Sequence, residues 1–518
     1  MVTMLNSLIC NNFAGIKRMD SRFTDSVISA SDMQNVELFD TGVNSGVGIR
    51  TMKGNTSILT LNNQNEIIVN CFQSVQNNQT YIFIHTETTN EGKIYLYNPT
   101  SGSLTLKVEG LTVTGKSCVV DFAQGWSDLC VFSNGEDILS IQIGKYDDNG
   151  VSQEVKTFSP VDVDGRNVKG MGLVVFDGRL WIFDGVALWY SVKENCYDFS
   201  TENPEITTSA GYIEFAKKIT AIYPYLGTLA VFHKDSSSLI KVNSDYSYSQ
   251  TDESPGGCAS SSSLVFHGTE LYFYDDTKKG IFSFAQVING DKTLGQNIAL
   301  DVQEELIDVD FNKLDIMKML SVVQSERNEI WFLIPNRDAQ HSIILIYDYI
   351  HSYWIKRKSQ KLNGIALLND NLYSFGDNKM YQEYNGDDFD GEFIESYYCC
   401  SPLNLSADNT MKILYMPPRV TLDMACTNDF MVQYVKNYDS IKKPKIKHIK
   451  SKNIKNLFYW DISYWDSSAI YKPKESNSIK NLPPSTFKTL EIKFYTTNSN
   501  QDFSIKNIEF SKIKVKQI

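Results

Sequence analysis

The residue types that most often carry out chemistry in proteins are few and far apart in this chain. Six histidines are present and no two of them lie four residues apart: His85, His233, His267, His341, His351 and His448. Zinc sites and nucleophilic sites need such side chains at closer, recognisable spacings. The chain also contains no G-x-S-x-G segment and no glycine-rich phosphate loop. The sequence therefore predicts neither zinc chemistry nor nucleophilic catalysis.

Two clusters of acidic residues are the next candidates, because carboxylate oxygens bind calcium. Asp162, Asp164 and Gly165 resemble the start of a calcium loop, but the glutamate that an EF-hand loop needs later is absent, because position 173 is Leu173. The second cluster comprises Asp387, Asp388, Asp390 and Glu392. Aspartate beside glycine serves equally well in turns. Calcium stays an alternative at either cluster, and the sequence predicts no metal site, no cofactor and no catalytic residue.

A run of lysines near the C-terminus could also form a site. Lysine contacts nucleic-acid phosphates, but a groove for an oligonucleotide also interleaves aromatic side chains, which this run lacks. Phosphate binding therefore stays an alternative to a solvated loop over residues 436–456 or to one side of a charge-complementary protein contact. Five residues are the candidates for such a contact: Lys442, Lys443, Lys445, Lys447 and Lys450.

The elements that would position these residues follow a repeated pattern of apolar runs and tight turns. The clearest copy has runs at residues 172–176, 179–183 and 186–190, joined by Asp177-Gly178 and Asp184-Gly185. Asp-Gly between β-prone runs predicts a type I′ hairpin turn, and two such turns predict a three-stranded meander. Comparable copies lie at residues 81–97, 129–141, 219–242, 264–284, 320–355 and 364–375.

Repeats of about 40–60 residues fit propeller blades of four strands each. Several β-sandwiches in series would also give short, regularly spaced strands. We favour the propeller because runs such as residues 343–347 are apolar at nearly every position, as strands covered on both faces are. The sequence therefore predicts an all-β fold, with a β-propeller of about six to eight blades. It also predicts a short helix within residues 301–319.

Charge divides the chain unevenly. The 518 residues carry a formal net charge of −12, but residues 436–518 hold 17 lysines and seven acids, so this part is +10 and the rest −22. The blade pattern also fades at both ends of the chain. We therefore expect an N-terminal platform segment at 1–55, a propeller at 56–385 and a C-terminal β-rich domain at 386–518, with the two ends forming one platform.

Cysteine usage and hydropathy indicate the compartment in which the chain is expected to fold. The nine cysteines show no disulfide-framework spacing, and no stretch of 18 apolar residues is present. The first ten residues lack the basic start and apolar core of a secretory signal. The sequence predicts folding in a reducing cytoplasm, with no disulfide and no membrane segment.

Enzymatic activity is not expected. A glycosidase propeller needs paired carboxylates in its central pocket. Sialidase-type propellers also repeat a Ser-x-Asp-x-Gly-x-Thr-Trp turn, of which this chain has no copy.

The N-terminal residues carry a resemblance to a known family. The relevant positions are Asn12-Phe13-Ala14-Gly15-Ile16, Arg18, Asp20, Ser21, Asp32, Gln34-Asn35-Val36, Leu38, Gly48, Ile49, Arg50 and Gly54. In this order they resemble the opening of nozzle proteins of short-tailed bacteriophages, also called tail tubular protein B-like or stabilisation proteins. Further similar segments follow in the family's order at residues 188–199, 229–242, 254–273, 344–354 and 460–466. The lysine-rich stretch 436–456 has no counterpart in that pattern.

The resemblance implies a structural virion protein. Six copies would form a ring below the portal and its adaptor, extend the DNA channel, help to retain the genome and conduct it at ejection. The implied partners are further copies in a homohexamer, the portal-adaptor (head-to-tail connector) protein, distal tail spike, fibre or needle proteins, and viral double-stranded DNA in passage. The implied location is the virion tail, after assembly in the host cytoplasm. The five lysines would then contact a neighbouring subunit or the adaptor.

Two other functions stay open. One is a host-surface propeller of the tail that binds a receptor or glycan. The other is a polysaccharide-degrading tail enzyme, which would need two carboxylates about 5–10 Å apart in the central pocket.

Overall fold

The computed structural model describes residues 2–516 with internal gaps. The gaps are residues 11, 18–26, 42–45, 125–126, 148, 162–166, 201–208, 285–293, 308–319, 335–340, 404–410, 415–417, 424–427, 438–443, 451–475 and 479–485. The chain forms two compact units. Unit 1 comprises Met1–Asn55, Leu345–Lys358 and Tyr384–Ile518, and unit 2 comprises Thr56–Ile344 and Ser359–Glu383.

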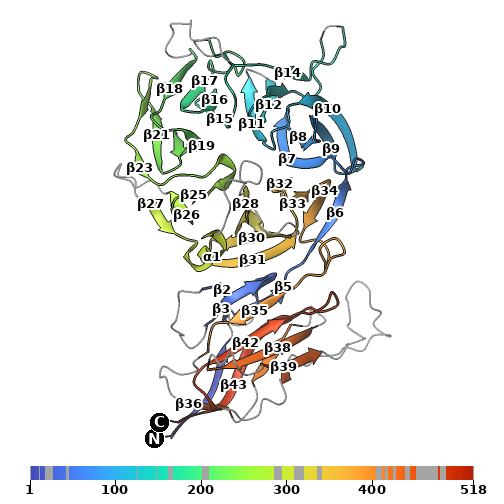
Figure 1. Ribbon diagram of the computed structural model, residues 1–518, viewed down its shortest axis with the longest axis vertical. Coiled ribbons are helices and arrows are strands. Elements are labelled where there is room, and N and C mark those ends of the chain that lie inside the picture. The colour runs from blue at the N-terminus through green and yellow to red at the C-terminus, as the bar shows by residue number, and fades with distance from the viewer. Residues whose placement is uncertain are drawn as a thin grey trace. The chain divides into compact units, whose positions relative to one another are not determined.

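Unit 2 contains six separate antiparallel sheets among the described residues, and each sheet is one blade (Figure 1). The first comprises β7 (Ile67–Gln76), β8 (Gln79–Glu87), β9 (Gly92–Asn98) and β10 (Ser103–Leu111); the second β11 (Cys118–Gln124), β12 (Ser127–Ser133), β13 (Ile138–Ile141) and β14 (Val155–Thr157); the third β15 (Leu173–Phe176), β16 (Arg179–Asp184), β17 (Ala187–Tyr190) and β18 (Gly211–Glu214). The fourth comprises β19 (Ile219–Tyr225), β20 (Thr228–His233), β21 (Ser236–Val242), β22 (Tyr248–Gln250) and β23 (Ser254–Pro255); the fifth β24 (Leu264–His267), β25 (Glu270–Asp275), β26 (Gly280–Phe284) and β27 (Leu294–Asn297); the closing sheet β32 (Gly364–Leu368), β33 (Asn371–Gly376), β34 (Lys379–Glu383) and β6 (Asn55–Thr60).

A further meander lies between the fifth and closing sheets. It comprises β28 (Leu320–Gln324), β29 (Glu329–Ile334), β30 (His341–Asp348) and β31 (Tyr353–Gln360), and it belongs to a larger, 18-stranded sheet. β28 contacts β24 on one side and β32 on the other, and β32 contacts β7, so the first strands of successive sheets close a ring. β6 joins the closing sheet as its outermost strand, which ties the start of unit 2 to its end. The predicted β-propeller is confirmed.

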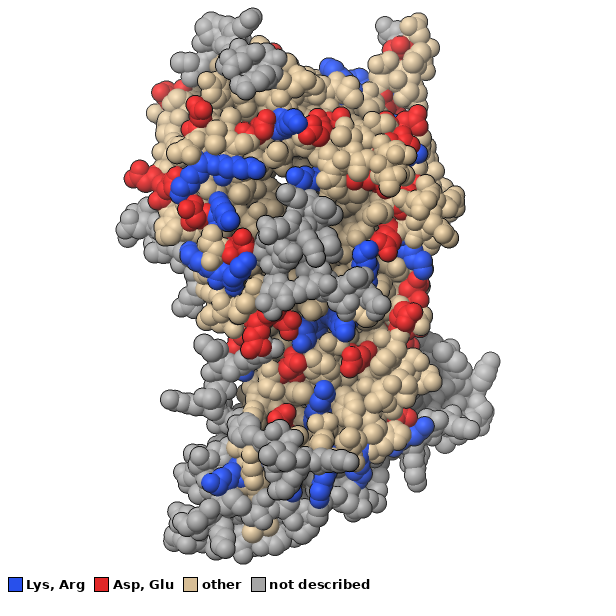
Figure 2. Space-filling view, viewed as in Figure 1, with Lys and Arg blue, Asp and Glu red and all other residues tan. Residues whose placement is uncertain are grey.

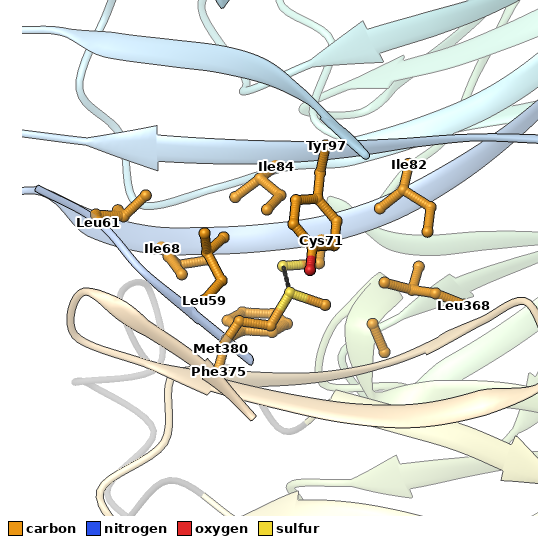
Figure 3. Packing of buried hydrophobic residues seen from close by; sticks show 11 residues of the cluster. Leu59, Leu61, Ile68, Cys71, Ile82, Ile84, Tyr97, Leu368, Phe375 and Met380 are labelled. Carbon is orange, nitrogen blue, oxygen red and sulfur yellow. Dashed lines mark hydrogen bonds between the residues drawn. The ribbon is translucent and has the colours of Figure 1, made fainter. Parts of the chain in front are cut away.

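Neighbouring blades are held together by apolar side chains that pack between their faces. Figure 3 shows the cluster between the closing and first sheets, where Phe375 and Met380 meet Ile68, Cys71 and Ile84. Each fully buried side chain of this size stabilises the fold by roughly 1.5–3 kcal/mol relative to exposure. Similar clusters join the first sheet to the second, the second to the third, the third to the fourth and the fourth to the fifth.

The hairpin turns follow the expected chemistry with one difference. Asp177 and Gly178 have φ values of 52° and 68°, which is the type I′ pattern. The second predicted type I′ turn is wrong, because Asp184 still pairs with Ala187 and the two-residue loop is Gly185-Val186. Gly185, with φ 62°, supplies the positive φ that a type II′ loop needs at its first residue.

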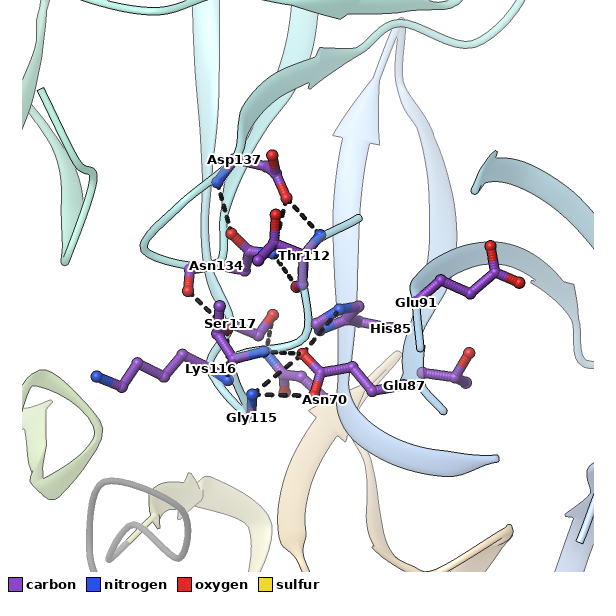
Figure 4. Close-up of polar contacts among 12 residues, drawn as sticks. Asn70, His85, Glu87, Glu91, Thr112, Gly115, Lys116, Ser117, Asn134 and Asp137 are labelled. Carbon is purple, nitrogen blue, oxygen red and sulfur yellow. Dashed lines mark hydrogen bonds and ion pairs between the residues drawn. The ribbon is translucent and has the colours of Figure 1, made fainter. Parts of the chain in front are cut away.

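Hydrogen bonds supplement the apolar contacts between the first two sheets (Figure 4). We call the bonds of Glu87 and Asn134 to residues 112–115 the polar latch. The buried carboxylate of Glu87, at the end of β8, accepts N–H bonds from Thr114 at 3.0 Å and from Gly115 at 2.9 Å. These donors lie in the segment that leads into β11. Asn134 lies in the turn after β12. Its side-chain amide donates to the carbonyl of Thr112, in the same segment, at 2.8 Å.

Unit 1 is also built from strands. It contains β1 (Val2–Cys10), β2 (Asn12–Ile16), β3 (Val27–Gln34), β4 (Val36–Asp40), β5 (Val47–Thr51), β35 (Tyr397–Cys400), β36 (Met411–Leu414), β37 (Arg419–Leu422), β38 (Asp429–Lys436), β39 (Lys445–Lys450), β40 (Ser476–Ser478), β41 (Thr486–Phe487), β42 (Leu490–Tyr495) and β43 (Ser504–Lys516). β1 pairs with β43 and β3 with β35, both antiparallel. The predicted platform formed by N- and C-terminal segments is therefore present.

One segment departs from the sequence-based division. Residues 345–358 were expected in the propeller, but they belong to unit 1. Ile16 of β2 pairs with Trp354, and the N–H of Asn35 donates to the carbonyl of Lys356 at 2.9 Å. The blade-like pattern of β30 and β31 hid this role, because strands buried on both faces look alike in sequence.

Helices are scarce in the described residues. The short helix expected within 301–319 is present as α1 (Gln303–Ile307), preceded by a 3-10 turn at Leu300–Val302. No helix in the described part of the chain has the length and apolar character needed to span a membrane.

Candidate interaction surfaces

The predicted contact lysines divide between a strand and undescribed residues. Lys442 and Lys443 lie outside the described residues. Lys445, Lys447 and Lys450 lie on β39, which pairs with β38 along its whole length. The expectation of a loop over 436–456 is therefore wrong for residues 445–450. Ile446 and Ile449 are three residues apart and face opposite sides of the strand, so the run gave no period-2 signal from which the strand could be predicted.

β39 presents charged and apolar side chains together, and we call residues 445–450 the basic edge. Among the described residues, β39 pairs only with β38, which pairs on its other side with β42. Ile449 is buried opposite Phe430, whereas Ile446 exposes 54% of its surface. Lys445 is also exposed. Lysine on an edge strand discourages pairing with the strand of another protein, so any contact here uses side chains.

Asp429 orders one end of the basic edge. Its carboxylate accepts a bond from His448 Nε2 at 2.5 Å and lies 3.2 Å from Lys450 Nζ. Partial burial alone would raise the pKa of Asp429, but the bonds from His448 and Lys450 outweigh it, so this pKa lies below its ordinary value. The aspartate is therefore ionised at neutral pH, and it compensates part of the positive charge at this end.

An acidic segment of unit 1 is the second charged surface. Residues 385–395, which we call the acidic loop, contain five acids and no lysine or arginine: Asp387, Asp388, Asp390, Glu392 and Glu395. Asp387, Glu392 and Glu395 are exposed, and Phe393 exposes 36% of its surface between them. The loop thus combines negative charge with an exposed aromatic side chain.

One acidic side chain of this loop, Asp388, takes part in a turn. Asp388 Oδ1 accepts the N–H of Gly391 at 3.0 Å, and Phe389 and Glu392 exchange backbone bonds. No group of three or more His, Cys, Asp or Glu residues is placed to hold a metal ion among the described residues. Asp162 and Asp164, of the other acidic cluster, lie outside those residues.

The start of the acidic loop is held by the backbone of residues 53–55. The N–H of Gly54 donates to the carbonyl of Gly386 and that of Asn55 to the carbonyl of Asp388, each at 2.9 Å. A Cβ at Gly54 would lie 1.6 Å from the carbonyl oxygen of Asp388. Only glycine permits this approach, so Gly54 sets the position of the loop.

The end of the loop is held by the Gln34-Asn35 pair. Both side-chain amides donate to the carbonyl of Glu395, at 3.1 and 3.0 Å. Asn35 is buried, has φ 52°, and its Oδ1 accepts the N–H of Lys358 at 2.9 Å. Asparagine tolerates this left-handed conformation better than most residues. One asparagine therefore fixes two segments far apart in the sequence.

The buried side chain of Arg357 contacts both the acidic loop and the backbone that holds its start. Its guanidinium is fully buried, and Nη1 donates to the carbonyl of Lys53 at 2.9 Å. It also lies 4.8 Å from the ring centre of Phe389, within the range of a cation–π interaction. Sequence reasoning did not find Arg357, because a single arginine inside a blade-like run has no distinguishing pattern.

The described cysteine thiols are not activated for nucleophilic attack. The eight described cysteines are free thiols, and burial raises the pKa of Cys196 and Cys258 to about 12 and that of Cys399 to about 11. These thiols are therefore protonated and poor nucleophiles at neutral pH. On the face drawn in Figure 2, acidic and basic side chains are interspersed over the described surface.

Comparison with solved structures finds lyases at low similarity. A streptogramin B lyase structure matches with 11% identity and a TM-score of 0.39, over 67% of this chain and 96% of that one. Virginiamycin B lyase from Staphylococcus aureus matches with 11% identity and a TM-score of 0.38, over 63% of this chain and 98% of that one. No protein-family model and no curated protein sequence matches the chain.

Proposed function

We propose that this chain is a structural protein of a short bacteriophage tail, in which copies form the nozzle ring around the DNA channel. One observation carries the proposal. Residues on which the family resemblance rests, including Gln34, Asn35 and Gly54, meet in unit 1 and position a single exposed loop. Residue types at these spacings therefore have a shared structural task, which supports a family relationship over chance similarity.

The architecture supports the same proposal. A channel wall has to be stiff, and interlocked blades that are packed by apolar side chains provide stiffness. The wall must also let DNA slide past, and a body with a net charge of −22 over residues 1–435 releases few counterions from DNA and binds it weakly. The ring would extend the channel below the portal and its adaptor, retain the genome and carry the distal tail components.

The test is to look for the chain in purified virions. Antibody against the chain should label the tail, and electron cryo-microscopy of that tail should show a sixfold ring of propeller-bearing subunits. A chain that is absent from purified particles would contradict the proposal. Labelling restricted to the distal tip, with binding to host-surface glycans, would favour the receptor-binding alternative. Turnover of a host polysaccharide would favour the enzyme.

A further inference from the structure

We propose that the basic edge of one copy docks against the acidic loop of a second copy of this chain. The inference rests on the proposed function and specifies its subunit contact. A ring of identical subunits needs two different surfaces on each copy, one for each neighbour. Unit 1 carries two such surfaces, one on β39 and one before β35.

The two surfaces are complementary in charge and in apolar content. The basic edge carries three lysines, and Asp429 partly compensates the charge of Lys450. Asp387, Asp388, Glu392 and Glu395 form no ion pair among the described residues. Each surface also exposes one large apolar side chain, Ile446 on the basic edge and Phe393 on the acidic loop. On β39, Ile446 lies on the same face as Lys450, and Lys445 lies on the other face, so a partner at this edge strand meets both. Apolar contact combined with opposite charge is a common composition of a specific contact.

The sheet of unit 1 keeps these surfaces apart within one copy. β39, β38, β42 and β35 are neighbours in that order, so two strands separate the basic edge from the strand that follows the acidic loop. Strands lie about 4.8 Å apart, which places β39 roughly 14 Å from β35. The partner for each surface is therefore a second molecule, and the contact is heterologous, as a ring requires.

The acidic loop is hydrogen-bonded to the rest of unit 1 at both of its ends. Backbone bonds to Gly54 and Asn55 hold its start, and Gln34 and Asn35 hold its end. A surface that is already ordered loses little conformational entropy on binding. Positive charge on an edge strand has another explanation, which is protection against strand-to-strand aggregation. If protection against aggregation were the only role of the lysines, self-association would not depend on the acidic loop. A charge-swap experiment therefore distinguishes the two explanations.

The experiment follows self-association of the full chain by sedimentation velocity at increasing protein concentration, in low and high salt. Wild-type protein should associate, and salt should weaken the association because the contact is charged. Lys445→Glu or Glu392→Lys alone should raise the dissociation constant roughly three- to tenfold. The two changes combined in one chain should restore it to within about threefold of wild type, because the swapped charges again attract.

Lys234→Glu is the matched control, because Lys234 is exposed in unit 2 and the charge change is identical. It should leave association unchanged, and far-ultraviolet circular dichroism should show every variant folded. The proposal is overturned if wild-type protein stays monomeric in low salt, if Lys445→Glu matches Lys234→Glu, or if the double variant is no better than its parents. None of these results shows whether the chain is present in virions, so the proposed function is tested separately from this contact.

Discussion

At the scale of single residues, several N-terminal positions are constrained by close packing, an ion pair or an unusual φ value. Gly15 lies so close to β31 that a Cβ would be 2.5 Å from the carbonyl oxygen of Trp354. Arg50 forms an ion pair with Glu37 at 2.5 Å, and Asn35 joins three segments. Their types are required because few residues fit the space or the φ value.

Gly54→Ala tests this account of the motif. The added methyl group would overlap the carbonyl of Asp388, so the acidic loop or residues 53–55 must move. We expect a loss of roughly 2–3 kcal/mol in the free energy of unfolding, measured by denaturant titration. Gly102→Ala is the control, because it has φ 67° but no atom within 4 Å of the new Cβ, and it should cost only about 1 kcal/mol. Equal losses in the two variants would show that packing against Asp388 is unimportant.

At the scale of elements, the hairpins could be predicted from the sequence, whereas the pairing of strands that are distant in sequence could not. Each apolar run of the third sheet became the strand expected from it, because Asp-Gly turns and β-prone runs act locally. The role of residues 345–358 and the pairing of Lys445–Lys450 depend on strands that are distant in sequence. The candidate surfaces were therefore only partly predictable: the lysines were identified, but the acidic loop was considered only for calcium.

Glu87→Gln tests the polar latch between the first two sheets. Glutamine keeps the size of the side chain but offers one acceptor oxygen where the carboxylate offered two, and it removes the charge from the bonds to Thr114 and Gly115. We expect a loss of roughly 1–3 kcal/mol in stability. Hydrogen exchange should quicken at the amides of residues 114 and 115 before it does elsewhere. Glu109→Gln, at an exposed position of β10, is the control. Unchanged exchange at both amides would contradict the latch.

At the scale of the whole chain, the two ends of the sequence complete each other. β43 lies against β1 over most of its length, and β35 lies against β3. The blade pattern is absent at both ends of the chain, and this predicted a shared platform. The exact strand pairing could not be inferred, because strand register depends on partners far away in sequence. Without the N-terminal segment, β43 and β35 would each lose a neighbouring strand, so we expect the two ends to fold together.

A fragment of residues 384–518 should therefore fail to fold by itself. β43 would lose its pairing with β1, and β35 would lose its pairing with β3, which exposes long apolar edges. We expect the isolated fragment to show no cooperative thermal unfolding by circular dichroism and to aggregate. The full chain is the control, because the same strands there have their partners. Co-expression with residues 1–55 should raise the soluble yield of the fragment, because β1 and β3 are then available in trans. Cooperative unfolding of residues 384–518 alone would contradict this view, since the C-terminal strands would then specify their own fold.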